Sequence, residues 1–330
     1  GRPQEAGRNA LCVHAPDDPD RSERDGVDVM PPGSNARTRV HEYGGGAVVF
    51  GEAGGGEIYY SEFATQRLCR LSKGGDDGSL GTSEPITPEG DRFRYADGIV
   101  SKDGSVIYCI REDHMKPEPK NVVNEVVSID VKDGSIKVLA TGNDFYAAPR
   151  VSPDGKQLAY ITWNHPNMPW DATELRVADI DSASPKSEDH ELIAGEDGDT
   201  SVIQPQWHPT TGDLYYISDQ SGYYNIYRAG YAPSVFPMEH DFGGSAPGWA
   251  LGQQGYSFLP GDDDGRLVAQ YSKDGGSVLV VADVSQKDSA ATNVQEYSGE
   301  DDGLPMMLGG LAPGGADSND LYFLGGSPSV

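Results

Sequence analysis

A short pattern recurs along this chain at nearly constant spacing. Each time, an alternating apolar stretch runs into a Gly/Asp-rich turn, and a second apolar stretch follows. The turns open at Phe50, Ser101, Ser152, His208, Leu259 and Leu311, at intervals of 51, 51, 56, 51 and 52 residues. A fixed period of this length, filled with strand-forming residues, is typical of a β-propeller built from four-stranded antiparallel blades. The repeat therefore predicts an all-β fold that serves as a platform or a gate.

The composition agrees with this prediction. Among 330 residues there are 43 Gly and 23 Pro, and the 17 Tyr outnumber the 8 Phe. This mixture favours strands joined by tight turns. Length alone suggests two domains, but all-β repeat folds of this size often form one. We therefore expect a single β-propeller domain over residues 1–330.

The chain is strongly acidic. It has 52 acidic and 25 basic residues, which gives a formal net charge of −27. Such a surface repels phosphate backbones and anionic lipid, so we expect neither nucleic acid nor a membrane as partner. The acids are spread over loops such as Asp17–Asp20, Asp262–Asp264 and Glu300–Asp302, which lack the alternating ligands and closing Glu of a calcium loop. We interpret the charge as a solubility device and expect no metal and no cofactor.

The three cysteines, Cys12, Cys69 and Cys109, each lie in an apolar stretch and show no CxxC spacing. Their odd number predicts buried, reduced thiols in a reducing compartment, the cytoplasm or alternatively an organelle lumen or stroma. The sequence has no run of about 18 apolar residues. Gly1–Gly7 does not resemble a signal peptide and reads like the interior of a protein.

Each repeat divides into strands A to D, from the innermost to the outermost. We expect strands A near Gly98–Ser101 and Pro149–Ser152, and further strands at Gln157–Trp163, Glu174–Asp179 and Leu214–Ser218.

This division places five complete blades at about 37–90, 91–143, 144–201, 202–247 and 248–303, with partial blades at 1–36 and 304–330. The first part supplies only C and D strands, at Asn9–Val13 and Val27–Met30. The last part supplies only A and B strands, at Met307–Ala312 and Asp320–Gly325. Two closures follow: seven blades with incomplete first and last blades, or six blades closed by mixed termini, which removes exposed edges.

Topology brings three distinctive segments to one face, here called the upper face. The chain enters each strand A from this face, and the B–C loops return to it. The segments are Val40–Gly46, His165–Asp171 and Asp219–Asn225. Lower-face turns such as Ser152–Gly155 follow ordinary turn chemistry. We therefore predict a working surface on the upper face. The candidate substrate-rim or interdomain residues are His41, Glu42, Tyr43, Asn167, Trp170 and Asp171.

Each candidate has a functional and a structural interpretation. His41 and Glu42 would act as an acid/base pair or would hydrogen-bond the loop that leads into the blade. We favour the second role, because the second His of an HExxH zinc motif is absent. Trp170, together with Met168, would line a peptide-binding rim or cap the core between blades, and both interpretations stay open. Asp171 would hold a substrate amine or cap the turn into strand C, which we favour.

Other segments predict structure rather than chemistry. Gly44–Gly46 would allow close backbone packing near the propeller axis, since no helix follows to form a phosphate site. Tyr223 and Tyr224 are expected to pack between blades. The GxSxG nucleophile elbow is absent, and Gly325–Ser329 comes closest but lacks the closing Gly. A Walker loop and a Rossmann fingerprint are also missing. No catalytic residues are therefore predicted.

Motifs along almost the whole chain form a series. They are Gly1 to Pro3, Glu5, Gly7-Arg8, Arg37 to Gly46, Arg94 to Asp97, Asn124-Glu125, Asp144 to Tyr146, Ser152 to Gly155, His165 to Asp171, Ser218-Asp219 and Gly325 to Pro328. This series resembles the dipeptidyl-aminopeptidase or acylaminoacyl-peptidase-like branch of the prolyl oligopeptidase family of serine peptidases. The HEYGGG and HPNMPWD strings are specific to this branch. Tyr223-Tyr224 departs from it, because tryptophans often stand there.

The resemblance implies a defined role. Members of this kind are two-domain enzymes, in which an N-terminal seven-bladed propeller limits access and shapes the pocket of a C-terminal α/β-hydrolase domain. That domain carries the Ser, Asp and His. This chain would be the propeller alone, with seven blades favoured, and its partners would be the hydrolase domain of the same parent chain and peptide substrates. Without the triad, the chain is expected to be inactive by itself.

Two other functions compete with this one. A stand-alone protein-binding or scaffold propeller is motivated by the absence of any nucleophile. A metal-dependent propeller hydrolase ranks last, because it would need carboxylate and amide ligands converging from several A strands, which carry few.

Overall fold

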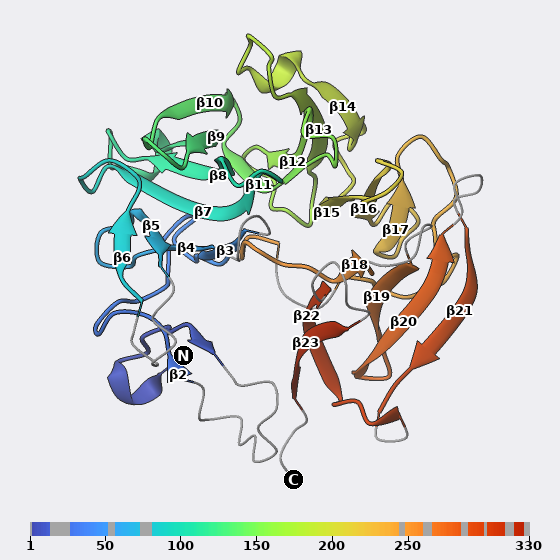
Figure 1. The fold of residues 1–330 in the computed structure, drawn as a ribbon. Helices are drawn as coiled ribbons and strands as arrows, with labels where there is room; N and C mark the ends of the chain where they lie inside the picture. The colour runs from blue at the N-terminus through green and yellow to red at the C-terminus, as the bar shows by residue number, and fades with distance from the viewer. Residues whose placement is uncertain are drawn as a thin grey trace. The chain divides into compact units, whose positions relative to one another are not determined.

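The computed structural model describes residues 2–13, 27–51, 57–72, 81–243, 248–259, 266–284, 290–299, 302–313 and 320–326. The chain divides into two compact units, Gly1–Thr141 and Gly142–Val330, each built of antiparallel sheets (Figure 1). The described helical elements are three short 3-10 turns, η1 (Pro3–Glu5), η2 (Pro119–Asn121) and η3 (Ser187–Asp189). The all-β prediction is therefore confirmed. No helix in the described ranges has the length and apolar character needed to cross a bilayer.

Unit 1 contains two four-stranded sheets and a short hairpin. The first sheet consists of β3 (Val48–Phe50), β4 (Ile58–Ser61), β5 (Leu68–Leu71) and β6 (Ser83–Pro85). The second consists of β7 (Phe93–Val100), β8 (Val106–Asp113), β9 (Val123–Asp130) and β10 (Ile136–Ala140). The hairpin pairs β1 (Cys12–Val13) with β2 (Val27–Asp28). Tyr59, Tyr95, Ile107 and Val127 form a core between the sheets, because alternate residues of each strand face inward.

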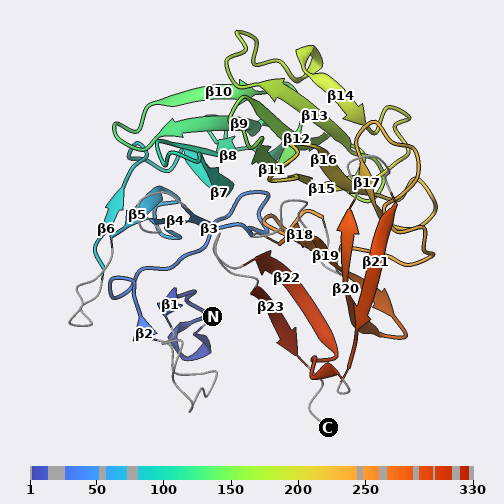
Figure 2. The ribbon, with the colours of Figure 1, turned by 45° about the vertical axis from the view of Figure 1, so that its right-hand side comes forward.

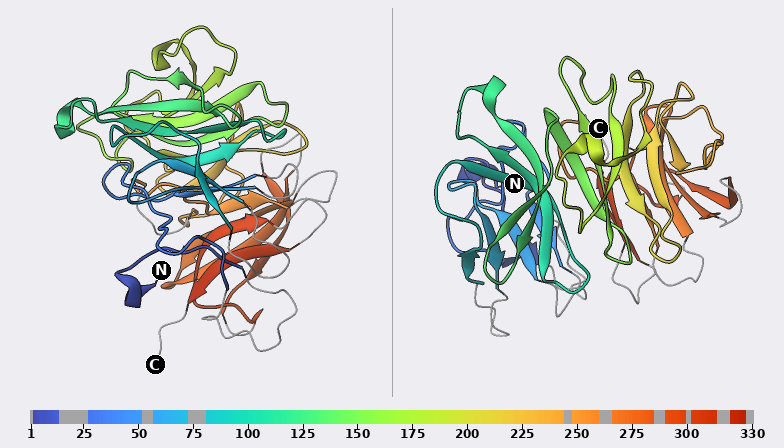
Figure 3. Two further views of the ribbon diagram at one scale, coloured as in Figure 1. Left: turned by 60° about the vertical axis from the view of Figure 1, so that its left-hand side comes forward. Right: turned by 90° about the horizontal axis from the view of Figure 1, so that it is seen from above.

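Unit 2 contains four sheets, which Figures 2 and 3 show from further sides. The first has four strands, β11 (Phe145–Val151), β12 (Gln157–Trp163), β13 (Glu174–Asp179) and β14 (Glu191–Ala194). The second has β15 (Val202–Trp207), β16 (Leu214–Ser218) and β17 (Asn225–Arg228). The third has β18 (Tyr256–Phe258), β19 (Arg266–Lys273), β20 (Gly276–Val284) and β21 (Ala291–Tyr297). The last pairs β22 (Met307–Pro313) with β23 (Leu321–Gly326).

Three pairs of successive sheets meet through their first strands. β3 lies beside β7 in unit 1, while β11 lies beside β15 and β18 beside β22 in unit 2. Large aromatic side chains such as Tyr215, Tyr256 and Phe258 fill the space between the sheets of unit 2. This arrangement of innermost strands is the one expected for blades of a propeller.

A backbone irregularity repeats with the same period as the sequence. The register between first and second strands shifts around Asp97, Ala148 and Gln204, and each of these non-glycine residues has a positive φ of 51° to 52°. The spacings are 51 and 56 residues, as for the turns. Gly46, 51 residues before Asp97, also has a positive φ, and its carbonyl accepts the Asp97 N–H at 2.8 Å. β7, β11 and β15 therefore each carry a bulge, and the bulge of β7 contacts the segment that leads into β3.

This bulge explains why two strand boundaries were predicted wrongly. The sequence placed first strands near Gly98–Ser101 and Pro149–Ser152, but β7 begins at Phe93 and β11 at Phe145. The bulge interrupts the apolar alternation, so only the part after it was recognised. Second and third strands such as β12 and β13 were predicted more closely, since no register shift interrupts their pairing.

One predicted complete blade has three strands within the described residues. After β17 the chain passes Pro233 and Pro237, which cannot donate to a β-ladder. Cys69 and Cys109 are buried as predicted, and burial raises the pKa of the Cys109 thiol to about 12. The prediction for Cys12 is wrong, because its two-residue strand leaves it exposed. The acidic loops Asp17–Asp20 and Asp262–Asp264, residues 300–301 of Glu300–Asp302, and Ser327–Ser329 of the Gly325–Ser329 string lie outside the described residues.

Candidate functional site

The HEYGGG segment of unit 1 is an unusually wound loop before β3. His41 and Glu42 have positive φ values of 54° and 62°, and Gly44–Gly46 continue at positive φ. Two consecutive non-glycine residues in the left-handed region cost conformational energy, so surrounding contacts must hold them. At Gly46 an added Cβ would lie 2.8 Å from the Asp97 Cα atom, which only glycine tolerates. The close packing predicted for the glycines is therefore present at this position.

Glu112, at the end of β8, holds this loop. Its Oε1 atom accepts the His41 backbone N–H at 2.7 Å, and its Oε2 atom hydrogen-bonds the His114 imidazole at 2.9 Å. The guanidinium of Arg94 lies 3.6 Å from the same carboxylate. Because Glu112 is only 4% exposed, these partners compensate the cost of burying its charge. The carboxylate thereby joins the loop to the start of β7 and to the end of β8.

The other two candidates of this loop differ in their surroundings. Glu42 forms an ion pair with Arg94, with 2.6 Å between Oε1 and Nη1, and Arg94 also donates to the Arg39 carbonyl. Tyr43 is 69% exposed. Glu42 and the His41 main chain thus bind the neighbouring strand ends, as the loop-holding interpretation predicts.

A groove lies beside this loop. Its volume is about 820 Å³, and it is formed by the β4–β5 loop, the segment before β7 and the segment after β8. The lining residues are Arg39, Ala64 to Arg67, Glu89 to Arg92, Arg94, His114, Met115 and Pro117. We call it the arginine groove, because Arg39, Arg67, Arg92 and Arg94 all line it. A cationic hollow of this kind suits an anionic ligand.

In unit 2 the HPNMPWD segment forms the β12–β13 loop. Asp171 accepts the Met168 backbone N–H at 2.8 Å, and its own N–H donates to the Met168 carbonyl at 2.9 Å. This is the turn cap that the sequence predicted for Asp171. The Asn167 N–H donates to the Asn164 carbonyl at 3.0 Å, and the Asn167 side chain is half-buried.

Two tryptophans meet at this loop. The ring of Trp170, which is 45% exposed, lies 4.7 Å from that of Trp249 in an edge-to-face arrangement. Met168 is exposed as well. We call Trp170 and Trp249 the tryptophan pair. Trp170 is thus exposed and Trp249 half-buried, and the peptide-binding rim stays a prediction.

Ser201, which directly precedes β15, holds the backbone next to Trp170. Its buried hydroxyl donates to the Pro169 carbonyl at 2.7 Å and accepts from the Tyr224 hydroxyl at 3.0 Å. Its N–H donates to Asp219 at 2.8 Å. Burial raises the pKa of the Asp219 carboxyl and also that of Tyr224. Tyr224 packs against the core as predicted, whereas the prediction for Tyr223 is wrong, because its side chain is exposed.

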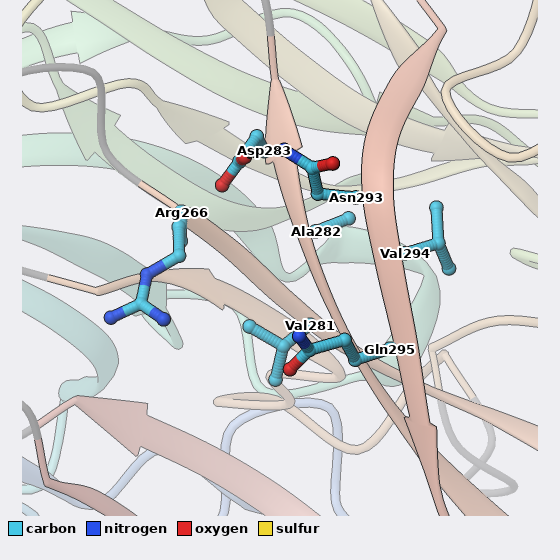
Figure 4. A pocket seen from close by; sticks show the side chains of 7 residues that line it. All are labelled: Arg266, Val281, Ala282, Asp283, Asn293, Val294 and Gln295. Carbon is cyan, nitrogen blue, oxygen red and sulfur yellow. Dashed lines mark hydrogen bonds between the residues drawn. The ribbon is translucent and has the colours of Figure 1, made fainter.

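A second, smaller hollow lies on the outer strands of unit 2. It has a volume of about 410 Å³ and is lined by Arg266, Val281 to Asp283 and Asn293 to Gln295. Figure 4 shows Asp283 and Asn293 close together, and the Asn293 amide donates to Asp283 at 2.7 Å. Because these two groups satisfy each other, the hollow gives no basis for a catalytic role.

The structure keeps the six predicted residues in two loops. His41, Glu42 and Tyr43 share one loop of unit 1, and Asn167, Trp170 and Asp171 share one loop of unit 2. Across the described ranges, no three His, Cys, Asp or Glu side chains are grouped as metal ligands. The roles of these six residues in binding stay a prediction.

Five residues that hold or pack against these loops were not among the six sequence-based candidates. They are Gln66, Arg94, Glu112, Ser201 and Trp249. Glu112 had a detectable signal, because a charge follows the apolar run of β8. Trp249 also had one, as a rare residue in a Gly-rich segment. Ser201 had none, since a buried serine at a strand start looks ordinary.

Comparison with known proteins identifies solved structures with a similar fold. No protein-family model matches the chain, and no curated protein matches it. Puromycin hydrolase matches with a TM-score of 0.73 and 24% identity, over 94% of this chain and 45% of that chain. A serine-to-alanine variant of puromycin hydrolase complexed with PGG matches with a TM-score of 0.75, 24% identity, and 94% and 46% coverage.

A third structure is more similar in sequence. A puromycin-hydrolyzing peptidase of Mycobacterium tuberculosis matches with a TM-score of 0.66 and 33% identity, over 78% of this chain and 40% of that chain. This chain thus spans less than half the length of each of these three proteins. It is an all-β chain of propeller type, and it resembles the propeller-like N-terminal region of prolyl oligopeptidase-family peptidases, as its motifs predicted.

Proposed function

We propose that this chain is the propeller domain of a serine exopeptidase or oligopeptidase. In that protein it limits the access of large substrates and shapes the pocket of a catalytic α/β-hydrolase domain. The observation that carries the proposal is the match to two kinds of puromycin-hydrolysing enzyme, over nearly all of this chain but less than half of theirs. The remaining length of those proteins leaves room for a domain that performs the chemistry.

The geometry of both units supports a gating role. In each unit, the loops at the starts of the first strands and between the second and third strands carry the exposed, chemically distinctive side chains. These loops are positioned by rigid sheets, which suits residues that contact a substrate or a neighbouring domain. Tyr43 and Trp170 are the residues we propose for such contacts.

Further parts of the proposal concern the architecture and the surroundings. We propose one propeller domain over residues 1–330 with seven blades, of which the first and last are incomplete. The hairpins β1–β2 and β22–β23, each with two strands, support incomplete blades at both places. We also propose peptide substrates, a partner hydrolase domain in the same parent chain and a cytoplasmic location.

The first test reads the gene beyond Val330. We expect an α/β-hydrolase segment with a GxSxG elbow, followed by Asp and His. A gene without such a segment would refute the peptidase assignment. The isolated chain should hydrolyse no aminoacyl or dipeptidyl anilide, and stoichiometric labelling by a fluorophosphonate probe would contradict this.

A second test uses the full-length protein. Trp170→Ala should raise KM for a dipeptidyl anilide severalfold and leave kcat within about twofold, because the loss concerns substrate binding rather than the reacting atoms. Tyr297→Ala is the matched control, since Tyr297 is an exposed aromatic residue on the outer strand β21. Equal effects of the two substitutions would remove Trp170 from the proposed rim.

The tryptophan pair also fits a stand-alone protein-binding propeller, because exposed Trp side chains are frequent anchors of interfaces. The two functions predict different outcomes for a pull-down from the source cells. A stable partner lost in the Trp170→Ala variant, in the absence of a hydrolase segment, would favour the scaffold.

A further inference from the structure

The arginine groove contains cations that no carboxylate neutralises. Arg92 and Arg94 are paired with acids, but Arg39 and Arg67 form no ion pair with any carboxylate among the described residues. The Arg39 guanidinium is exposed and lies 4.5 Å from the ring centre of Phe63. Stacking of this kind orients a guanidinium and leaves its N–H donors for another acceptor.

The groove is already organised around Arg39. The buried side chain of Gln66 accepts the Arg39 backbone N–H at 2.8 Å and donates to the Phe63 carbonyl at 2.8 Å. Gln66 itself has a positive φ of 56°, so the turn stores strain in order to place these contacts. The Arg39 main chain and its stacking partner are thus held before any ligand arrives.

The other arginines are fixed as well. Arg92 makes two hydrogen bonds to Asp113, with Nε–Oδ1 and Nη2–Oδ2 distances of 2.7 and 2.5 Å. Arg67 donates to the Thr87 carbonyl at 2.8 Å. Restricting these long side chains in advance removes much of the entropy that a ligand would otherwise have to overcome.

We propose that the arginine groove binds a carboxylate of a peptide, presented by an acidic side chain or by a free C-terminus. A guanidinium fork matches a planar carboxylate, and Met115 and Pro117 offer apolar contact beside it. Glu89 and Asp91 also line the groove, and the chain carries a net charge of −27. These charges oppose a polyanion such as nucleic acid, whereas a single carboxylate suits the two unneutralised arginines.

The test measures binding directly and does not depend on the proposed peptidase function. An unlabelled peptide of glutamine and alanine with one central glutamate and an amidated C-terminus is titrated into the purified protein at low salt, and calorimetry gives Kd. Arg39→Gln should weaken binding about tenfold, because it removes the fork that faces the carboxylate. Arg39→Lys should recover only part of the loss, since lysine lacks the planar fork.

Arg37→Gln is the matched control. Arg37 is exposed, lies 4.9 Å from the ring centre of the same Phe63 and carries the same charge, but does not line the groove. It should weaken binding less than about twofold, as a change in long-range charge alone. Equal weakening by the two glutamine variants would overturn the proposal, because binding would then be nonspecific attraction.

Further peptides distinguish the sources of the carboxylate. A glutamine–alanine peptide with a free C-terminus tests the terminal carboxylate, and its amidated form tests the need for any carboxylate. If the glutamate peptide or the peptide with a free C-terminus binds, and Arg39→Gln weakens that binding, the proposal is supported. The peptide that binds then shows whether the carboxylate comes from a side chain or from the C-terminus. The proposal fails if the amidated glutamine peptide binds as well as the glutamate peptide. It also fails if inorganic phosphate displaces the bound glutamate peptide at a concentration where acetate does not.

Discussion

The arginine groove of unit 1 and the tryptophan pair of unit 2 occupy corresponding positions on their sheets. Each is built from the segment before a first strand and from loops around a second strand. Yet one is a hollow lined with four arginines and the other a pair of indole rings, of which Trp170 is exposed and Trp249 half-buried. The repeated strands therefore determine where a functional loop lies, while the loop residues alone determine its chemistry.

The two regions are also held by different forces. In unit 1 the buried carboxylate of Glu112 and the Arg94–Glu42 ion pair hold the HEYGGG loop, while the Arg92–Asp113 ion pair joins the segment before β7 to the end of β8. In unit 2 the neutral hydroxyl of Ser201 links Pro169 to Tyr224. Ion pairs respond to acid and salt, whereas hydroxyl bonds respond mainly to removal of the partner. This contrast can be tested by matched substitutions.

The largest expected effect concerns a glycine in each region. Gly46→Ala places a Cβ 2.8 Å from the Asp97 Cα and 2.9 Å from the Asp97 N atom, at a φ of +57°. Because backbone cannot move aside, the free energy of unfolding should fall by about 2–4 kcal/mol. Gly248→Ala meets only the ring of Pro169, so it should cost about 1 kcal/mol. Denaturant unfolding measures both, and similar losses would show that the two loops are equally constrained.

A smaller effect is expected at the support of the tryptophan pair. Ser201→Ala removes the donor to Pro169 and the acceptor for Tyr224, so it should destabilise by about 1–3 kcal/mol. Its control is Ser221→Ala, an exposed serine near Tyr223 whose loss should stay within about 0.5 kcal/mol. Acrylamide quenching of tryptophan fluorescence should increase only in the first variant. An unchanged stability of Ser201→Ala would mean that neutral hydrogen bonds do not hold this region.

The smallest expected effect is an opposite dependence on pH. Hydrogen bonds from Arg92 lower the pKa of Asp113, whereas burial raises the pKa of Asp219. The unfolded chain therefore binds more protons at Asp113, and its stabilisation is lost as pH falls below about 4. At Asp219 the folded chain binds more protons, so that its contribution is present at low pH and is lost as pH rises above about 4.

Asparagine variants measure these two contributions. The stability difference between the unsubstituted protein and Asp113→Asn should shrink as the pH is lowered from about 5 to about 3. For Asp219→Asn, the variant should gain stability relative to the unsubstituted protein as the pH rises over the same range. Parallel curves for both variants would contradict the assigned directions of the two pKa shifts.

Much of the fold could be predicted from the chain, and less of the site. β12, β13 and β16 were predicted at their observed bounds, because their apolar alternation is unbroken and tight turns flank them. The candidate loops were found because their residues are unusual for turns. Their supports at Gln66, Glu112 and Ser201 were missed, because each acts on a residue distant in sequence.

By itself, the sequence determined the repeat, the antiparallel strands and the loops that carry unusual residues, since alternation and turn chemistry are local properties. Only the tertiary structure decided that Arg94 forms an ion pair with Glu42, that Arg39 stacks on the Phe63 ring and that Trp170 packs against Trp249. The physical reason is that charge pairing and ring packing depend on distances between segments that no local pattern encodes.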